Sequence, residues 1–558
     1  MTWVLPALLL GIPLAGAVVV TIAPARQAKW IALGATTVTF VLSVILAVAF
    51  EHWHDGGFGL DGVIPGLGIE SIGIRFSFGV DSVALLLVLL TTLLMPLCVW
   101  GSFSAITERV KEYYGWLLVI EAAMIGVFVA RDLIFFYICF EVTLIPMYFL
   151  IAIWGSSDRA RACIKFFLYT FTGSLIALAG LLYVAWQHAE INASFDLQGV
   201  VQLSWTFDIA ELSTFAATQL NHNEQAWVLL ALLAGFAVKV PLFPVHTWLP
   251  LAHTEAPAAG SVILAGVLLK LGTYGLYRFV LPMVPDAVVE YAPVIAVIAI
   301  IGILYAALIC WVQTDLKRLV AFSSISHLGF CVLGLFALNP LGAQGSVLYM
   351  INHGLSTGAL FFLIGMIYER YHCRDMNRIG GLAARMPVWA FFMVFFTLAS
   401  VGLPGLNGFV SEFLCLIGTF TSTADVGTAV TAAYPGRLGP WYAVAAGAGM
   451  ILGAMYLLMM VGKVVFGPLR EPSVTDEPHR SRLPADLSWR EIGVLLPLAV
   501  LCVYLGFQPS PVMNAIEGSI ENTLAAYPAR VRQHVADTGV PVTRPAPVLT
   551  LVREPRDD

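Results

Sequence analysis

The sequence predicts an all-α, polytopic membrane protein with about fourteen transmembrane helices, two of them discontinuous. Of its 558 residues, 59% are hydrophobic and only 11% are charged, whereas soluble domains carry about 25% charged residues. Apolar runs of about 18 residues or more recur along the chain, and each is long enough to cross a bilayer as a helix. Prolines and glycines interrupt two of these runs.

The predicted spans follow one another through the chain. They cover approximately residues 3–22, 31–50, 82–103, 113–130, 133–154, 164–187, 226–251, 256–280, 291–313, 319–338, 344–369, 388–420, 441–462 and 491–507. The first span has no basic segment before it and a second span follows closely, so we expect a retained helix rather than a cleaved signal. Span 7 is interrupted between Pro241 and Pro244, and span 12 between Gly402 and Gly408.

The two interrupted spans lie five spans apart. A repeat of five helices contains an odd number, so its second copy must be inverted in the membrane, and inverted repeats with discontinuous helices are typical of ion-coupled transporters. The repeats would be spans 4–8 and 9–13, each broken at its fourth helix. The predicted domains are 1–112 with spans 1–3, 113–280 as the first repeat, 281–465 as the second, 466–507 as an inner loop with span 14, and 508–558 as a polar tail.

The distribution of basic residues predicts the orientation in the membrane. With the N-terminus outside, about two thirds of the 29 lysines and arginines fall in inner loops, which agrees with the excess of basic residues on the inner side of membrane proteins. Most of the others fall in outer loops and the C-terminal tail. We therefore expect a multi-pass chain with both termini outside.

Composition and motifs exclude several function classes. The eight cysteines are scattered with no C-x-x-C pair, which argues against iron–sulfur clusters, c-type haem and a disulfide framework. There is no basic stripe with interleaved aromatic residues for nucleic acid, and no Walker loop or dinucleotide fingerprint. The sequence therefore predicts no cofactor-binding and no metal-ligating residues.

Two lysines stand within the predicted spans, at Lys239 and Lys270. A charged side chain at bilayer depth costs about 2.5–3.5 kcal/mol on insertion scales, and a broken helix frees backbone groups that lipid cannot satisfy. A lysine near a helix end can also reach the headgroups, but span 7 continues beyond Pro244, and Lys270 lies near the middle of span 8. Buried charge beside a helix break predicts an ion pathway.

Two carboxyl groups are candidates for the same pathway, Glu141 in span 5 and Glu412 just after the break in span 12. A buried charge is tolerated mainly when it is paired, so Glu141 is predicted to pair with Lys239. Closing the pair would hold a proton on the lysine, and opening it would release the proton. The alternative is a structural carboxyl group bonded to backbone that Pro146 leaves open.

Two histidines, His327 and His353, lie within spans 10 and 11. Histidine can relay protons near neutral pH, although each could also be a packing residue, and no carboxylate or cysteine accompanies them at metal-ligand spacing. His246 and His253 flank the inner end of span 7, either as groups on the path or as interfacial polar residues. Glu121, a further buried carboxyl group in span 4, has no assigned role.

Several motifs resemble one known family, the antiporter-like subunits of proton-pumping NADH–quinone oxidoreductase (respiratory complex I), which is shared with multisubunit cation/proton antiporters. The matching segments are Gly79-Val80-Asp81, Phe140-Glu141 through Tyr148, Phe236 through Pro257, Gln313 through Leu319, Ser326 through Gly329, His353 through Ser356 and Gly402 through Glu412. They extend over spans 3–12. Fourteen spans and no long lateral helix in the tail differ from what is expected of chain L. Glutamate rather than lysine at 412 differs from what is expected of both the L and N chains. The sequence therefore resembles a third branch of the family most closely.

The resemblance implies roles, partners and location. It places Glu141 and Lys239 at the input side, Lys270 at the centre, His327 and His353 as a bridge, and Glu412 at the exit end. It implies that NADH, FMN, iron–sulfur clusters and quinone bind to partner subunits and no redox cofactor binds here. The expected partners are other membrane-arm subunits, including the L and N antiporter-like chains, and the lipid of a bacterial plasma (inner) membrane.

The predicted function is proton translocation through these buried residues, coupled to remote NADH oxidation and quinone reduction, in a subunit of a translocase enzyme. One alternative is a subunit of a cation/proton antiporter that works without NADH. Another is an enzyme with its own quinone or redox chemistry, which no motif supports, and a third is a purely structural scaffold. The Pro- and Arg-bearing tail is a candidate for a lineage-specific contact.

Overall fold

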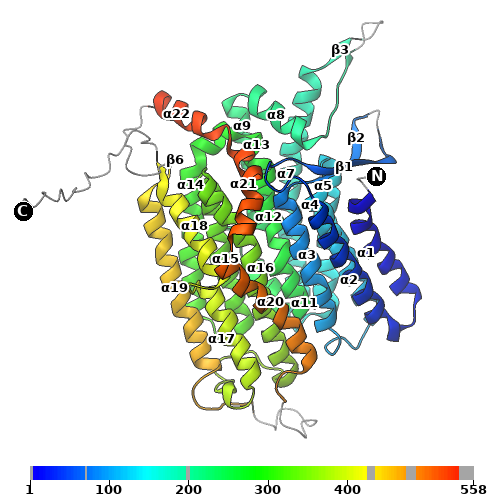
Figure 1. The fold of residues 1–558 in the computed structure, drawn as a ribbon, viewed down its shortest axis with the longest axis vertical. Coiled ribbons are helices and arrows are strands. Elements are labelled where there is room, and N and C mark those ends of the chain that lie inside the picture. Colours follow the sequence, from blue (N-terminus) through cyan, green and yellow to red (C-terminus); the bar gives the residue numbers. More distant parts are fainter. Residues whose placement is uncertain (1–3, 70–71, 196–200, 424–433, 473–484, 539–558) are drawn as a thin grey trace, which may run out of the picture.

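Long helices standing side by side make up most of the computed structural model (Figure 1), which describes residues 4–69, 72–195, 201–423, 434–472 and 485–538. Twelve helices within these residues are long and apolar enough to cross a membrane. They are α1 (Val4–Ile22), α2 (Ala25–Ala49), α3 (Ser82–Gly101), α4 (Val110–Val129), α5–α6 (Leu133–Val142 and Leu144–Trp154), α7 (Arg159–Ile191), the segment Ala258–Met283, α14 (Pro285–Val312), α15 (Leu316–Phe336), α16 (Pro340–Tyr371), α19 (Pro440–Val464) and α20 (Trp489–Phe507).

The segment Ala258–Met283 alternates between α-helix and the wider π-helix. It consists of α11 (Ala258–Ile263), η2 (Leu264–Leu268), α12 (Leu269–Gly275), η3 (Leu276–Val280) and α13 (Leu281–Met283). The π-turns η2 and η3 flank α12, which carries Lys270. Such π-turns inside α-helices occur frequently at functional sites.

Two further spans are each built from two helices, and they are spans 7 and 12 as predicted. Span 7 consists of α9 (His222–Lys239) and α10 (Leu249–Glu255), and span 12 of α17 (Pro387–Val401) and α18 (Asn407–Thr421). With the twelve continuous helices, these pairs confirm the prediction of fourteen spans with two interruptions. The inverted relation of the two repeats stays a prediction.

The first interruption follows Lys239, the last residue of α9. Pro241 and Pro244 cannot donate backbone hydrogen bonds, so the helix ends and leaves carbonyl groups of its last turn without helical partners. The indole Nε1 of Trp248, which is fully buried, donates to the carbonyl of Val238 at 2.9 Å. This bond satisfies one freed carbonyl inside the protein, as a break at bilayer depth requires.

The second interruption is a glycine-capped helix end. Gly402 has φ +81°, a left-handed conformation, and its N–H bonds to the carbonyl of Leu398. The N–H of Leu403 reaches the same carbonyl at 3.1 Å. Glycine is the usual residue at this position because it has no Cβ to oppose positive φ.

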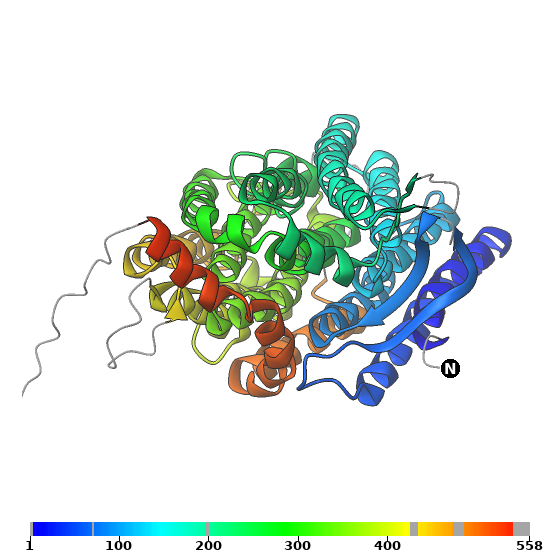
Figure 2. The same cartoon turned by 90° about the horizontal axis from the view of Figure 1, so that it is seen from above.

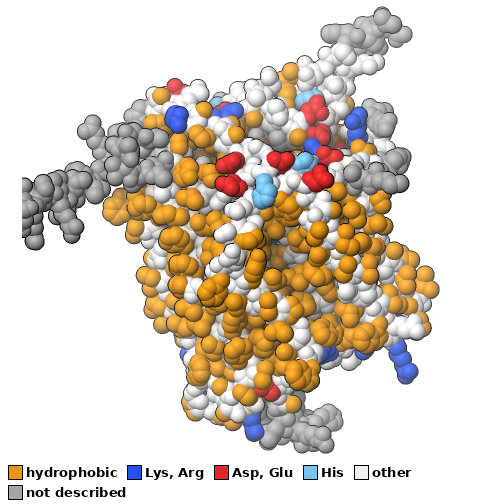
Figure 3. All heavy atoms as spheres, viewed as in Figure 1, with side chains coloured by type: hydrophobic (Ala, Val, Ile, Leu, Met, Phe, Trp, Pro, Cys, Tyr) orange, Lys and Arg blue, Asp and Glu red, His pale blue; other side chains and the backbone are white. Residues whose placement is uncertain are grey.

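The surface of the molecule has an apolar band between two charged ends. Figure 3 shows hydrophobic side chains over the middle of the visible face and charged ones mainly near its two ends. Large apolar residues such as Trp441 and Ile451 are 84% and 67% exposed, whereas ionisable residues such as Lys270 and Glu121 are fully buried. This inverted distribution is what a lipid environment favours.

The two ends of the described chain lie at the same end of the bundle (Figure 1), as an even number of spans requires. We call it the outer end, following the predicted orientation. It carries the antiparallel hairpin of β1 (Gly59–Ile69) and β2 (Ile74–Val80), the short pair β3 (Ser194–Phe195) and β4 (Val201–Gln202), α8 (Ile209–Gln219), and the parallel pair β5 (Ser422–Thr423) and β6 (Tyr434–Pro435). The short 3-10 turn η4 (Leu382–Ala384) precedes α17 at the other, inner end.

The C-terminal segment differs from the polar tail that the sequence predicts. Residues 510–538 form α21 (Ser510–Leu524) and α22 (Tyr527–Thr538). Helix α21 runs along the bundle towards the outer end (Figure 1), and α22 lies across that end (Figure 2). Ile516, Ile520 and Leu524 recur at helical spacing and are buried, and the Tyr527 hydroxyl donates to the carbonyl of Leu281 at 2.7 Å. One apolar stripe thus docks each helix on the bundle, and residues 539–558 lie outside the described part.

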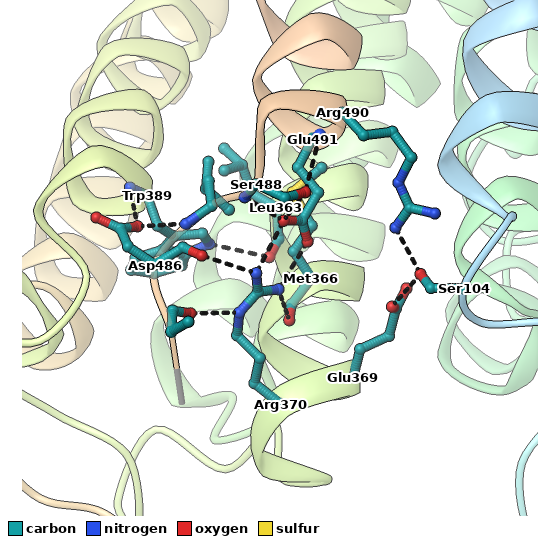
Figure 4. A network of polar contacts seen from close by, with 12 residues as sticks. Ser104, Leu363, Met366, Glu369, Arg370, Trp389, Asp486, Ser488, Arg490 and Glu491 are labelled. Carbon is teal, nitrogen blue, oxygen red and sulfur yellow. Dashed lines mark hydrogen bonds and ion pairs between the residues drawn. The ribbon is translucent and has the colours of Figure 1, made fainter. Parts of the chain in front are cut away.

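At the inner end, a half-buried arginine connects three helices (Figure 4). The guanidinium of Arg370, near the end of α16, makes two bonds of 2.7 and 2.8 Å to the carboxylate of Glu491 in α20. It also donates to the carbonyl of Asp486 at 3.1 Å. The Asp486 side chain in turn accepts from the N–H groups of Val388 and Trp389 at the start of α17. These bonds fix the inner ends of α16, α17 and α20 to one another.

A second branch of this network reaches the loop that follows α3. The hydroxyl of Ser104 donates to Glu369 at 2.8 Å and accepts from the Arg490 guanidinium at 2.7 Å (Figure 4). Glu369 is one residue before Arg370 on α16, and Arg490 is one residue before Glu491 on α20. The inner end of α16 is therefore held from two sides.

Candidate functional site

The predicted site residues occupy the interior of the bundle, with one exception. Glu141 is half-buried, and the others are buried: Lys239, Lys270, His327, His353 and Glu412. They come from α9, α12, α15, α16 and α18, which the chain brings together from positions up to 173 residues apart (239 and 412).

Lys270 and His353 are in direct contact at the centre of the site. The lysine Nζ lies 2.7 Å from the histidine Nδ1 and also donates to the carbonyl of Ala265, in the π-turn that precedes it. Since an ammonium group only donates hydrogen bonds, Nδ1 of His353 is the acceptor while Lys270 is charged. The proton of Lys270 therefore points directly at a group that can take it.

Lys270 and His353 are the first two members of a row of polar side chains that extends to Glu412, and His327 is the next member after His353. The two imidazole rings lie 5.8 Å apart between centroids, and both rings are almost fully buried. Nε2 of each ring has no hydrogen-bond partner among the described residues. Buried polar atoms are rarely left without a hydrogen-bond partner unless water or an exchanging proton provides one. The two Nε2 atoms are therefore the positions at which a proton can pass between the rings.

Tyr349, which the sequence analysis did not single out, joins His327 to Glu412. Its hydroxyl lies 2.6 Å from Nδ1 of His327 and donates to Oε1 of Glu412. The same nitrogen and carboxylate oxygen are 3.3 Å apart. The signal available in the sequence was spacing alone, because residues 349 and 353 are four apart and share one face of α16.

The carboxylate of Glu412 lies against the second helix break. A Cβ atom at Gly402 would stand 2.6 Å from Oε2 of Glu412, closer than side chains tolerate. Oε2 has no hydrogen-bond partner among the described residues. Gly402 is therefore needed twice, for its positive φ and for the space that it leaves to this carboxylate.

Reciprocal amide bonds attach the broken helix to α16. Nδ2 of Asn352 donates to the carbonyl of Asn407 at 2.7 Å, and Nδ2 of Asn407 donates to the carbonyl of Asn352 at 3.2 Å. Asn352 also donates to the hydroxyl of Ser411 at 3.2 Å. Because Asn352 precedes His353 on α16 and Ser411 precedes Glu412 on α18, these bonds fix the position of His353 relative to Glu412.

Lys239 lies at the end of α9 in a largely apolar pocket. Its Nζ stands 4.4 Å from the centre of the Phe140 ring and 3.5 Å from the hydroxyl of Thr143. The aromatic face and the hydroxyl are attractive but weak partners for an ammonium group. A Cβ at Gly272 would come within 3.0 Å of the Lys239 Cβ, so α9 packs tightly on α12 two residues beyond Lys270.

The predicted pair between Lys239 and Glu141 is not a contact in this structure. Oε1 of Glu141 has no hydrogen-bond partner within the described ranges, and the two charges interact only through space. Helical geometry explains the separation: Thr143 faces Lys239, and a residue two positions earlier points about 200° away. Glu141 instead shares its face with Ile138 and Ile145, which are 43% and 45% exposed.

Two further buried polar groups lie towards the inner end. Lys317, which lies between the predicted spans 291–313 and 319–338, is 6% exposed and donates to the carbonyl of Ala256 beyond α10. His253 is fully buried, with its ring parallel to that of Phe361 at 4.6 Å and no hydrogen-bond partner at either nitrogen among the described residues. Neither group is hydrogen-bonded to the row from Lys270 to Glu412 within the described residues, but His253 interacts electrostatically with Lys270.

Glu121 stands apart from the row. It lies in α4, is fully buried, and neither carboxylate oxygen has a hydrogen-bond partner within the part of the chain described. An ionised carboxylate without a partner is strongly disfavoured in such surroundings.

A broken-helix bundle enclosing a row of lysine, histidine, tyrosine and glutamate defines the class of antiporter-like membrane subunits. Residues 130–434 match the family described as NADH:quinone oxidoreductase/Mrp antiporter, TM. The chain belongs to this family, in the branch of the NADH-quinone oxidoreductase M subunits. The sequence features favoured this branch over the L and N chains, so this prediction is confirmed.

Similar proteins cover nearly the whole chain. The NADH-quinone oxidoreductase subunit M of Rhodobacter capsulatus is 40% identical over 525 residues, which is 93% of this chain and 96% of that protein. The subunit M of Pseudomonas aeruginosa is 41% identical over 508 residues, 88% and 91% of the two chains. A chain of respiratory complex I from Thermus thermophilus with bound NADH superposes with a TM-score of 0.79 at 28% identity, covering 94% of this chain and 99% of that one.

Proposed function

We propose that this chain conducts protons from Lys239 to Lys270 and then along the row from Lys270 to Glu412, as an antiporter-like subunit of a proton-translocating NADH–quinone oxidoreductase. The observation that carries the proposal is the unbroken sequence of contacts from Lys270 through His353, His327 and Tyr349 to Glu412. Ionisable groups in a membrane interior are costly. A row of such groups in mutual contact is therefore expected where protons pass from one group to the next.

The input end is proposed to work as a switch. In this structure Glu141 and Lys239 are separated, and the polar and aromatic partners of the lysine among the described residues are Phe140 and Thr143. Movement of Glu141 towards Lys239 would hold a proton on the lysine through an ion pair, and separation would release that proton towards Lys270. The close packing at Gly272 places the two lysines on adjoining helices.

The lateral face around Glu141 is proposed to contact a neighbouring membrane subunit. A half-buried carboxylate between Ile138 and Ile145 would be costly against lipid, whereas a polar group on a partner would stabilise it. The family supplies the candidates, the L and N antiporter-like chains. We also assign the complex to the bacterial plasma membrane, with both termini of this chain outside.

Redox chemistry is proposed to reside on partner subunits, with NADH, FMN, iron–sulfur clusters and quinone bound there. The support is the sequence, which contains no C-x-x-C pair and no dinucleotide fingerprint. An absorption spectrum of the purified chain tests this assignment, since haem or flavin bands that copurify with the chain would contradict it.

Replacement of the central lysine tests the proposed conduction. Lys270→Met keeps the length of the side chain and removes its charge. In vesicles containing the assembled complex, we expect NADH-driven proton uptake to fall at least about tenfold, since proton transfer by a positioned group contributes roughly 10²–10⁴-fold. The matched control is Lys463→Met, which changes an exposed lysine in the last turn of α19 and should leave uptake unchanged.

NADH oxidation by ferricyanide, which requires no proton transport, measures how much complex is assembled in each preparation. Uptake by Lys270→Met equal to that of Lys463→Met, at equal ferricyanide activity, would refute the proposal and leave a structural role for the chain. Uptake that depends on sodium in membranes given no NADH would instead favour the cation/proton antiporter alternative.

A further inference from the structure

Tyr349 occupies a position that the proposed path cannot bypass without a longer step. Its hydroxyl touches the last histidine of the row, at 2.6 Å from Nδ1 of His327, and the terminal carboxylate, through the bond to Oε1 of Glu412. The side chain is 3% exposed. A hydroxyl both donates and accepts hydrogen bonds. The Tyr349 hydroxyl can therefore accept a hydrogen bond from His327 while it donates one to Glu412.

The helices hold the tyrosine in this geometry. Tyr349 and His353 lie four residues apart on α16 and point to the same side, towards His327 of α15 and Glu412 of α18. The Tyr349 ring packs edge-on against His327, with centroids 6.0 Å apart. The amide bonds of Asn352 to the start of α18 keep the carboxylate within reach.

Each step of the route through the hydroxyl is shorter than a direct transfer from His327 to Glu412. Nδ1 and Oε1 are 3.3 Å apart, whereas charge-assisted bonds between nitrogen and carboxylate are normally about 2.7–2.9 Å. The hydroxyl hydrogen of Tyr349 points to Glu412, which leaves its oxygen to accept the N–H of His327. The bonds are thus already aligned for transfer in one direction.

We propose that Tyr349 is a proton-relay residue between His327 and Glu412, an inference that rests on the proposed function. Protonated His327 gives its Nδ1 proton to the tyrosine oxygen while the original hydroxyl proton passes to the carboxylate of Glu412. One N–H and one O–H bond break and two O–H bonds form. The products are neutral His327, an intact tyrosine and protonated Glu412, so charge and atoms balance.

The relay has to be reset before it can act again. After transfer, the new hydroxyl proton lies on the His327 side, and the C–O bond must rotate to present it to Glu412. Each rotation therefore accompanies one proton.

Removal of the hydroxyl is the first test. In assembled complex in vesicles, Tyr349→Phe should lower NADH-driven proton uptake at least about tenfold, at unchanged ferricyanide activity. The matched control is Tyr114→Phe, because Tyr114 is also buried in the bundle, on α4, and its hydroxyl has no hydrogen-bond partner among the described residues. This control should pump like the parent complex.

Fluorinated tyrosines at position 349 separate a relay from a merely structural bond. Ring fluorine makes the phenol a stronger acid with little change in size, so both hydrogen bonds can form. A relay predicts that the uptake rate changes progressively with the number of fluorine atoms, because proton-transfer rates follow acid strength. A structural role predicts one rate for all fluorinated forms, and that result would overturn the inference.

The outcome with Lys270→Met distinguishes this inference from the proposed function. If Lys270→Met abolishes uptake while Tyr349→Phe pumps like Tyr114→Phe, the path exists but protons pass directly from His327 to Glu412, and the relay is refuted. If Lys270→Met pumps normally, the proposed function itself fails. If Tyr349→Phe does not assemble, the fluorinated series decides alone.

Discussion

Gly402→Ala should displace the terminal carboxylate of the row without changing any ionisable residue. A Cβ at this position would lie 2.6 Å from Oε2 of Glu412. Because the carboxylate is the flexible end of a side chain, it would rotate away before the backbone moved. That rotation would take Oε1 from the hydroxyl of Tyr349, the bond that completes the row.

The cost follows from two features of the structure. The backbone at Gly402 has φ +81°, and a left-handed conformation costs a residue with a Cβ about 1–2 kcal/mol. A hydrogen bond to a charged group contributes about 1.5–3 kcal/mol. Gly402→Ala should therefore destabilise this region by about 2.5–5 kcal/mol in total.

Gly405 supplies a control within the same break. It has φ +92°, but the nearest atom to its added Cβ would be in the Phe507 ring, at an ordinary 3.5 Å. Gly405→Ala should thus carry the backbone cost of about 1–2 kcal/mol and leave Glu412 in place. The two variants differ chiefly in the position of one carboxylate.

The assay is NADH-driven proton uptake by vesicles, normalised to ferricyanide activity, together with thermal unfolding of the complex in detergent. Both variants should unfold at lower temperature, and only Gly402→Ala should lose uptake. Equal loss of uptake in both variants would mean that backbone strain, and not the carboxylate, is responsible, and the reasoning about the row would be wrong.

Two predictions concern stability alone. Glu121→Leu removes a fully buried carboxyl group that has no hydrogen-bond partner among the described residues, so the free energy of unfolding should rise by about 1–3 kcal/mol; lower resistance to denaturant would show instead that the group has an essential partner. Trp248→Phe removes the indole bond to the carbonyl of Val238 and should lower stability by about 1–3 kcal/mol, measured by thermal unfolding. The control for Trp248→Phe is Trp227→Phe, at a 69% exposed position of α9. This variant should unfold at the same temperature as the parent protein.

The fold was largely predictable because lipid restricts what a chain can do. Fourteen spans and two breaks follow from apolar length and from Pro241, Pro244 and Gly402, since unsatisfied backbone is excluded from a bilayer. The helices α21 and α22 were missed because their apolar stripe is only a few residues wide and is interspersed with polar side chains. Outside the membrane, polarity alone does not separate a docked helix from an extended tail.

The site was predictable as a set of residues but not as a set of contacts. Lys270, His353 and Glu412 are conspicuous because ionisable groups in apolar runs are costly. Their mutual distances depend on the rotation of three helices, which a single sequence does not specify. For the same reason Tyr349 was overlooked, as a tyrosine in an apolar run looks like packing, and Glu141 was paired with a lysine that its side of the helix does not face.

The bonds of Arg370 have a consequence for chemistry far from them. Arg370 and Tyr349 belong to one uninterrupted helix, α16, and 21 residues at 1.5 Å each separate them by about 32 Å. A rigid rod clamped at its inner end cannot spin about its own axis, and a twist of one residue, about 100°, would turn both Tyr349 and His353 away from their partners. The loop that carries Asp486 and the start of α20 therefore determine, from the membrane boundary, whether the buried side chains remain aligned.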